Sequence, residues 1–305
     1  MSTQKLPWQS EIWASFAAGL REDRTPHGLL IAGSRGVGKR ALAERLTAAL
    51  LCEARGADGD ACGQCRGCRL LAAGQHPNLQ RLSPEEGKRD IAMDAIRELI
   101  ERLALTSHYG GRKLALIDPA DALNISSVNA LLKTLEEPPA GSHLILITER
   151  LQGLPATLRS RCQILRLAPP PAAEADAWMA AHCAEVPKAR RDAFRRKPLA
   201  LAQSEADPAR WSRCLEDALA GRVGEAVRGL KDLKRDEAEA MLPWLLEQFA
   251  ARMRSGGAQA AAAAELIPEV VEAQRRLAGN ASPQLLAESL MIRVTQKFRT
   301  GVSPV

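Results

Sequence analysis

The stretch Gly33-Ser34-Arg35-Gly36-Val37-Gly38-Lys39-Arg40 decides the fold of the first part of this 305-residue chain. An apolar run over residues 28–32 precedes it and predicts a buried strand, and the apolar positions of residues 41–51 fall on one face of a helix. Glycines let backbone N–H groups converge on a phosphate, and the start of the helix adds partial positive charge. A strand, a glycine-rich loop and a helix in this order predict a nucleotide-binding loop, with candidate residues Gly33, Gly36, Gly38 and Lys39.

Two positions depart from what ATP hydrolysis needs. Arg40 stands where a serine or threonine hydroxyl would hold Mg²⁺. Pro119 follows Asp118 at the end of a predicted strand, where such hydrolases commonly have a glutamate that activates water. We therefore expect a structural role for Asp118, and we expect Asp121 to cap a helix rather than to replace the missing base. Hydrolysis is disfavoured, whereas weak binding of ATP or ADP stays open because the glycines and Lys39 remain.

Four of the seven cysteines crowd into residues 52–68, after the predicted loop helix. Their spacing predicts a tetrahedral zinc site with the ligands Cys52, Cys62, Cys65 and Cys68. A structural zinc is favoured over a catalytic one, because no histidine or carboxylate is plainly available to complete an open site. An iron–sulfur cluster is the alternative, disfavoured because no Cys-Pro follows, and disulfides are disfavoured in a reducing compartment.

Composition and charge give weaker constraints. The net charge of +6 is compatible with a nucleic-acid or acidic partner, and equally with an ordinary solvated surface. One tyrosine and four phenylalanines give little support to an aromatic platform for single strands. No apolar run is long enough to cross a membrane and the first nine residues lack a signal-peptide core, so we expect a cytoplasmic protein.

The pattern of elements predicts more than one domain. Five apolar strands alternate with helices over residues 1–168, which predicts a parallel α/β sheet with helices on both faces. A stiff proline-rich stretch, residues 168–171, marks a boundary. Beyond it, residues 169–207 predict short helices, and residues 208–305 predict a bundle of about five alanine- and leucine-rich helices.

Two further motifs carry a family resemblance. They are Asn129-Ala130-Leu131-Leu132-Lys133-Thr134-Leu135-Glu136-Glu137-Pro138-Pro139 and Ser160-Arg161-Cys162. With the cysteine module inserted at residues 52–68, they make the chain resemble, essentially end to end, the AAA+ clamp-loader subunits of bacterial DNA polymerase III. The resemblance implies an AAA+ P-loop domain over residues 1–168, a helical lid over 169–207 and a helical collar for oligomerisation over 208–305.

The resemblance also implies a function. Such a subunit would join gamma/tau and delta subunits in a hetero-pentamer of the polymerase holoenzyme that loads the sliding clamp onto primer-template DNA. Arg161 matches an arginine finger, a guanidinium that stabilises the transferring γ-phosphoryl in the ATP site of a neighbouring gamma/tau subunit. Arg40, Pro119 and Pro198, the last at the place of a usual lid arginine, imply a subunit without independent catalysis.

Three alternatives remain. The chain could be a weakly active AAA+ ATPase in its own right. Arg161 could be a surface arginine that pairs with a local acid. The cysteine module could bind DNA, since it carries Arg66 and Arg69, although it lacks a recognition helix at zinc-finger spacing.

Overall fold

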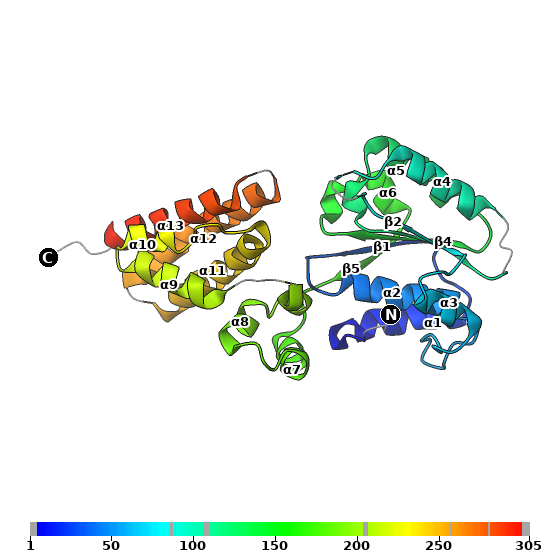
Figure 1. Ribbon diagram of the computed structural model, residues 1–305, viewed down its shortest axis with the longest axis horizontal. Coiled ribbons are helices and arrows are strands. Elements are labelled where there is room, and N and C mark those ends of the chain that lie inside the picture. Colours follow the sequence, from blue (N-terminus) through cyan, green and yellow to red (C-terminus); the bar gives the residue numbers. More distant parts are fainter. Residues whose placement is uncertain are drawn as a thin grey trace. The chain divides into compact units, whose positions relative to one another are not determined.

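The computed structural model describes residues 5–300, apart from residues 86–87, 89, 106–109, 204–206, 257 and 280. The chain forms two compact units, Met1–Glu174 and Ala175–Val305 (Figure 1). The first unit is α/β, and the second is helical throughout its described residues. The division falls a few residues beyond the proline-rich stretch, close to the boundary predicted there.

A five-stranded parallel sheet forms the centre of the first unit, with the strand order β2-β3-β4-β1-β5. The strands are β1 (Gly28–Gly33), β2 (Leu79–Leu82), β3 (Lys113–Ile117), β4 (Ser142–Thr148) and β5 (Gln163–Leu167). Because all of them run in the same direction, the segments that follow β1, β3 and β4 meet at one edge of the sheet. The segments that precede β1 and β5 meet at the opposite edge. The predicted parallel α/β domain is confirmed.

Helices cover both faces of this sheet (Figure 1). Leu29 and Ile31 of β1 point to a core shared with the first two helices, whereas Leu30 points to a core on the other face. The first face carries α1 (Ser10–Arg21) and α2 (Lys39–Leu51), and the second carries α4 (Met93–Ala104), α5 (Ile125–Glu136) and α6 (Ala156–Ser160). The remaining elements of this unit are η1 (Pro7–Gln9), α3 (Arg66–Ala72), η2 (Ala120–Ala122) and η3 (Leu151–Gly153).

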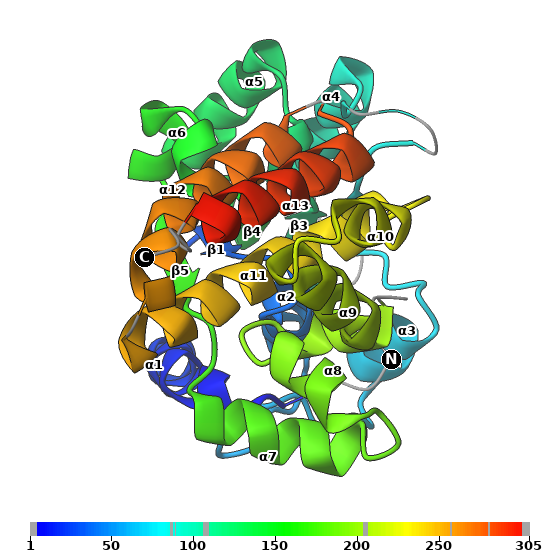
Figure 2. The same ribbon diagram turned by 90° about the vertical axis from the view of Figure 1, so that its left-hand side faces the viewer.

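The second unit consists of helices. They are α7 (Ala172–His182), whose first turn belongs to the first unit, α8 (Lys188–Ala193), η4 (Pro198–Gln203), α9 (Pro208–Leu219), α10 (Val223–Arg228), α11 (Arg235–Ser255), α12 (Ala258–Ala278) and α13 (Pro283–Thr300). Buried Trp211, Phe249, Leu266 and Val294 show that α9, α11, α12 and α13 enclose one core (Figure 2). The bundle of about five helices predicted over residues 208–305 is confirmed for its described residues, which form α9 to α13. The border between lid and collar stays a prediction, because α8 packs on both α9 and α11.

No helix in the described part of the chain is long and apolar enough to cross a membrane.

Candidate functional site

The glycine-rich loop follows β1 at the carboxyl edge of the sheet. Gly36 and Gly38 have φ angles of 80° and 99°, a region that side chains with a Cβ rarely adopt, and α2 begins directly after them at Lys39. Trp8 and Gln9 of η1 donate hydrogen bonds to the carbonyl oxygens of Val37 and Gly38, each at 2.9 Å. The chain therefore builds the phosphate loop that its sequence predicts, and η1 holds that loop from outside.

Lys39 lies inside the loop with only 7% of its surface exposed. Its Nζ donates to the carbonyl oxygen of Ser34 at 2.9 Å and to Oε1 of Glu149, just beyond β4, at 3.4 Å. Burial lowers the pKa of Lys39, and the carboxylate of Glu149 opposes that shift. Two of the three N–H donors of the ammonium group thus already have acceptors within the chain, and an entering phosphate would have to compete with these acceptors.

Arg40 and Asp118 form an ion pair between Nε of the guanidinium and Oδ2 of the carboxylate. A bound Mg²⁺ needs oxygen ligands, and here the residue after Lys39 offers none, while the carboxylate after β3 already has a guanidinium beside it. These residues do not fit a hydrolytic Mg²⁺ site. The pair thus brings Arg40 beside the aspartate that precedes Pro119, the second departure seen in the sequence.

Asp121 does not cap a helix, so that expectation is wrong. Its carboxylate accepts hydrogen bonds from the backbone N–H groups of Glu149, at 2.9 Å, and Arg150, at 3.3 Å. It thereby ties η2 to the end of β4. A partner so distant in sequence leaves no signal in the local pattern.

The four predicted cysteine ligands come together. The sulfur atoms of Cys52, Cys62, Cys65 and Cys68 all lie within 4.8 Å of one another. The Sγ–Sγ distances are 3.9 Å for Cys52–Cys65 and 4.0 Å for Cys62–Cys68. A tetrahedron with Zn–S bonds of about 2.3 Å has edges of about 3.8 Å, so the cluster fits a tetrahedral metal ion of that size.

Backbone N–H groups point at three of these sulfurs, those of Cys52, Cys62 and Cys65, and favour negative charge on them, whereas burial raises the pKa of Cys68. The N–H groups of Cys62 and Cys65 point at the sulfurs of Cys52 and Cys62, at 3.3 and 3.2 Å, and the N–H group of Cys68 points at the sulfur of Cys65 at 3.4 Å. Burial raises the pKa of Cys65, but the N–H donors of Cys68 and Glu53 outweigh it and bring that pKa to about 6. Burial raises the pKa of Cys52. A thiolate is the form that ligates a metal.

Arg161 lies at the opposite, amino edge of the sheet, between α6 and β5. A Cβ built on Gly28, the first residue of β1, would lie 3.1 Å from the carbonyl oxygen of Arg161, so the two backbones are in close contact. The guanidinium pairs with the carboxylate of Glu136 and donates from Nη1 to the carbonyl oxygen of Thr157 at 3.1 Å. The Arg161 side chain is still 34% exposed. The local ion pair that the sequence left as an alternative is therefore present in the single chain.

Arg161 and the glycine-rich loop of the same chain lie at opposite edges of the sheet. β1 runs from Gly28, beside Arg161, to Gly33, where the loop begins. Five residue steps at about 3.3 Å each place the two ends about 16 Å apart. Arg161 and Lys39 therefore do not form one site within a single chain.

Glu136 and Glu149 are residues that the sequence did not single out. Glu136 ends α5 inside the Asn129–Pro139 motif, and this position was the one available signal. Glu149 follows β4 at the edge where the loop lies, which could have suggested a partner for Lys39.

Comparisons with known proteins agree with this arrangement. The family described as "DNA polymerase III, delta subunit" matches residues 8–171. DNA polymerase III subunit delta' of Escherichia coli strain K12 is 37% identical over 261 residues, 83% of this chain and 78% of that protein. Subunit delta' of Pseudomonas aeruginosa is 36% identical over 77% of this chain and 68% of that protein. Subunit tau/gamma of Haemophilus influenzae is 35% identical over 50% of this chain and 22% of that protein.

The parallel α/β unit, with its glycine-rich loop between β1 and α2, coincides with the region that matches a family of DNA polymerase III subunits. Both delta' relatives are identical to this chain at more than a third of the aligned residues, and the alignments cover most of both chains. The chain belongs to the delta' family of DNA polymerase III subunits.

Proposed function

We propose that this chain is a clamp-loader subunit that does not hydrolyse ATP itself and supplies Arg161 to the ATP site of a neighbouring gamma/tau subunit. The observation that carries the proposal is the position of Arg161. It lies at the edge of the sheet opposite its own phosphate loop, with a third of its side chain exposed. A residue in that place acts on a nucleotide only if a second subunit brings the nucleotide to it.

The chemistry follows from the guanidinium group. Arginine has five N–H donors in a planar fork and stays charged at any physiological pH. Glu136 and the carbonyl oxygen of Thr157 engage two of its nitrogen atoms from one side. The remaining donors can hydrogen-bond the γ-phosphoryl oxygens as negative charge develops on them, which stabilises the transition state of phosphoryl transfer.

The chain's own loop supports the non-hydrolysing part of the proposal. Arg40 stands at the position where a hydroxyl would bind Mg²⁺, and its guanidinium pairs with the carboxylate of Asp118. Pro119 has no group that could activate water. The alternative is a weak ATPase, favoured by the intact glycine loop and by Lys39. Steady ATP turnover by the purified chain alone, lost in Lys39→Ala, would favour that alternative.

The cysteine cluster is proposed to hold a structural zinc ion. Four sulfurs at tetrahedral spacing leave no open position for a substrate. When bound, the metal would supply only cross-linking of the segment after α2. Metal analysis of the purified chain by mass spectrometry tests this, with about one zinc per chain expected and iron or no metal contradicting it.

Family membership supports the partners and the location. We infer a hetero-pentamer with gamma/tau and delta subunits that places the sliding clamp on primer-template DNA in the cytoplasm. The test mixes this chain with gamma/tau and delta, measures co-elution, and then measures clamp loading onto primed DNA with and without this chain. Complete loading without the chain, or failure to co-elute, would contradict the proposal.

A further inference from the structure

The first part of the cysteine module, directly after α2, is a loop that contains no helix or strand. It covers residues 53–61 and joins Cys52, at the end of α2, to Cys62. The other three ligands, Cys62, Cys65 and Cys68, lie on one short stretch and are near one another by chain connectivity alone. The course of residues 53–61 therefore decides whether Cys52 faces the other three ligands.

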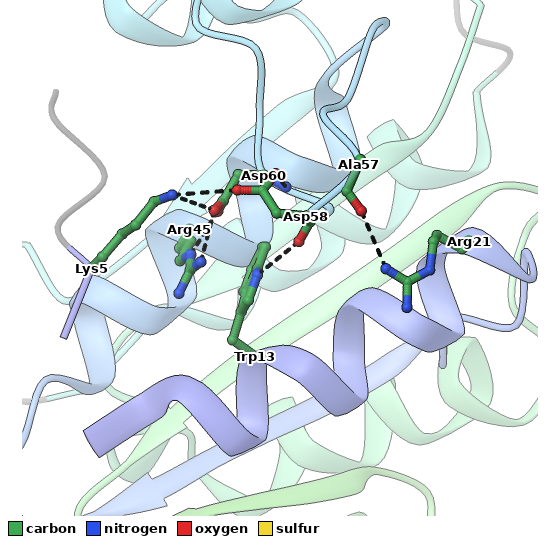
Figure 3. Close-up of polar contacts among 7 residues, drawn as sticks. All are labelled: Lys5, Trp13, Arg21, Arg45, Ala57, Asp58 and Asp60. Carbon is green, nitrogen blue, oxygen red and sulfur yellow. Dashed lines mark hydrogen bonds and ion pairs between the residues drawn. The ribbon is translucent and has the colours of Figure 1, made fainter. Parts of the chain in front are cut away.

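One ion pair fixes this loop to α2 (Figure 3). Arg45, on α2, donates from Nε to Oδ1 of Asp60 at 2.6 Å and from Nη2 to Oδ2 at 2.7 Å. The two side chains are 8% and 13% exposed. A two-pronged, charge-assisted pair in such a place defines both the distance and the orientation of its partners. Loss of Asp60 would also leave the buried guanidinium of Arg45 without its carboxylate partner.

Contacts from the start of the chain surround this pair. The guanidinium of Arg45 lies 3.7 Å above the centre of the Trp13 ring on α1, and Nε1 of Trp13 donates to the carbonyl oxygen of Asp58 at 3.1 Å. Nζ of Lys5 lies 2.7 Å from Oδ2 of Asp60 (Figure 3). A Cβ built on Gly59 would lie 2.7 Å from Cβ of Ala17, so the loop also sits against the backbone of α1.

We propose that Lys5, Trp13, Arg45 and Asp60 form a latch that sets the metal affinity of the cysteine cluster. The inference rests on the proposed zinc ion and deepens it. The latch closes the loop between Cys52 and Cys62 before the metal arrives, so binding does not have to order that loop. The latch residues are positioning residues, because none of them is itself a metal ligand.

The size of the effect follows from loop closure. The probability that the two ends of a free loop meet falls as the three-halves power of the number of residues in the loop. For a loop of about ten residues this lowers the probability of closure by about thirtyfold. This is the largest loss of affinity expected if the loop became wholly free. Loss of residues that orient metal ligands commonly weakens binding by about 10- to 100-fold. We expect about a tenfold loss when the Arg45–Asp60 pair is broken.

The test measures zinc affinity of the full chain. The metal is removed under reducing conditions, and Zn²⁺ is then titrated in competition with a chromophoric chelator. Asp60→Asn breaks the pair with little change in shape. Glu44→Gln is the matched control, because Glu44 is the neighbouring residue on α2 and accepts an equivalent two-pronged pair from Arg81, away from the module. The dissociation constant should rise about tenfold in Asp60→Asn and stay within about twofold in Glu44→Gln.

A second variant guards against misfolding. Lys5→Ala removes an exposed partner of Asp60 without opening the core, and we expect it to weaken zinc binding by about two- to threefold. Native affinity in both Asp60→Asn and Lys5→Ala overturns the latch and leaves the metal proposal standing. A native chain that binds no zinc overturns the metal proposal, and the latch with it. Equal weakening in Glu44→Gln also overturns the latch, because the effect would then be one of general stability.

Discussion

Replacing Glu136 by alanine tests how the fold presents Arg161. The ion pair between them is partly exposed, at 34% for Arg161 and 48% for Glu136, so its loss should change the free energy of unfolding by less than about 1 kcal/mol. The loss of this pair should have a larger effect on the proposed action of Arg161 in the ATP site of a neighbouring subunit. Without the pair, the long arginine side chain must be ordered in each reaction, which costs about 0.5–1.5 kcal/mol. At about 1.4 kcal/mol per factor of ten, this is a two- to tenfold loss of rate. Loss of the guanidinium itself should cost about a thousandfold or more.

The assay is single-turnover ATP hydrolysis by a reconstituted clamp loader with the sliding clamp and primed DNA. Glu136→Ala should lower the rate by about two- to tenfold, and Glu136→Gln, which keeps an acceptor oxygen, should stay within about twofold of the native rate. Glu137→Ala is the matched control, because Glu137 is an exposed neighbour with the same charge. A native rate in Glu136→Ala, or a loss as large as that of Arg161→Ala, would contradict a positioning role for Glu136.

Three further predictions concern the rest of the α/β unit. Gly59→Ala should lower the free energy of unfolding by about 2 kcal/mol, measured by chemical denaturation, because φ is +80° and the new Cβ meets Ala17. Adding Ala17→Gly should recover part of this loss. A double variant whose loss equals the sum of the two single losses would contradict this contact. Burial lowers the pKa of His143 below 6.5, so the unfolded chain binds the proton more readily. Stability should be fully present above about pH 6.5 and fall below it, by up to about 1.4 kcal/mol per pH unit. Thermal unfolding of His143→Gln should show a flatter dependence between pH 5 and 7, and an unchanged slope would refute this assignment. Arg40→Thr should free Asp118 and supply a hydroxyl. Mg²⁺ should then strengthen the binding of a fluorescent ADP analogue at least about tenfold. Binding that does not depend on Mg²⁺ in this variant would show that Arg40 is not what excludes the cation.

The sheet and the loop could be predicted because their signals are local. Apolar runs such as residues 28–32 and 114–117 lie in strands buried on both faces, and Gly36 and Gly38 of the loop occupy positions that need positive φ. The spacing of the cysteines likewise identified a cluster whose sulfurs come together in the fold. In each case neighbours in sequence are also neighbours in the structure.

The polar contacts could not be predicted, because their partners are distant in sequence. Asp121 was expected to cap a helix and instead accepts hydrogen bonds from residues just beyond β4. Arg40 was recognised as a departure and Asp118 as an aspartate at a strand end, and only the fold shows that the two side chains pair. The Arg45–Asp60 pair closes a loop of charged and small residues whose sequence predicts no structure. Charged residues pair with whatever the tertiary fold brings near, and periodicity carries no information about this.

The most direct measurement of the central claim compares native chain with Arg161→Ala in the complete clamp loader. Co-elution with gamma/tau and delta must first show that both versions assemble. ATP hydrolysis stimulated by the clamp and primed DNA is then measured under single-turnover conditions. We expect normal assembly and about a thousandfold slower hydrolysis at the neighbouring site. Native hydrolysis by an assembled Arg161→Ala complex would contradict it.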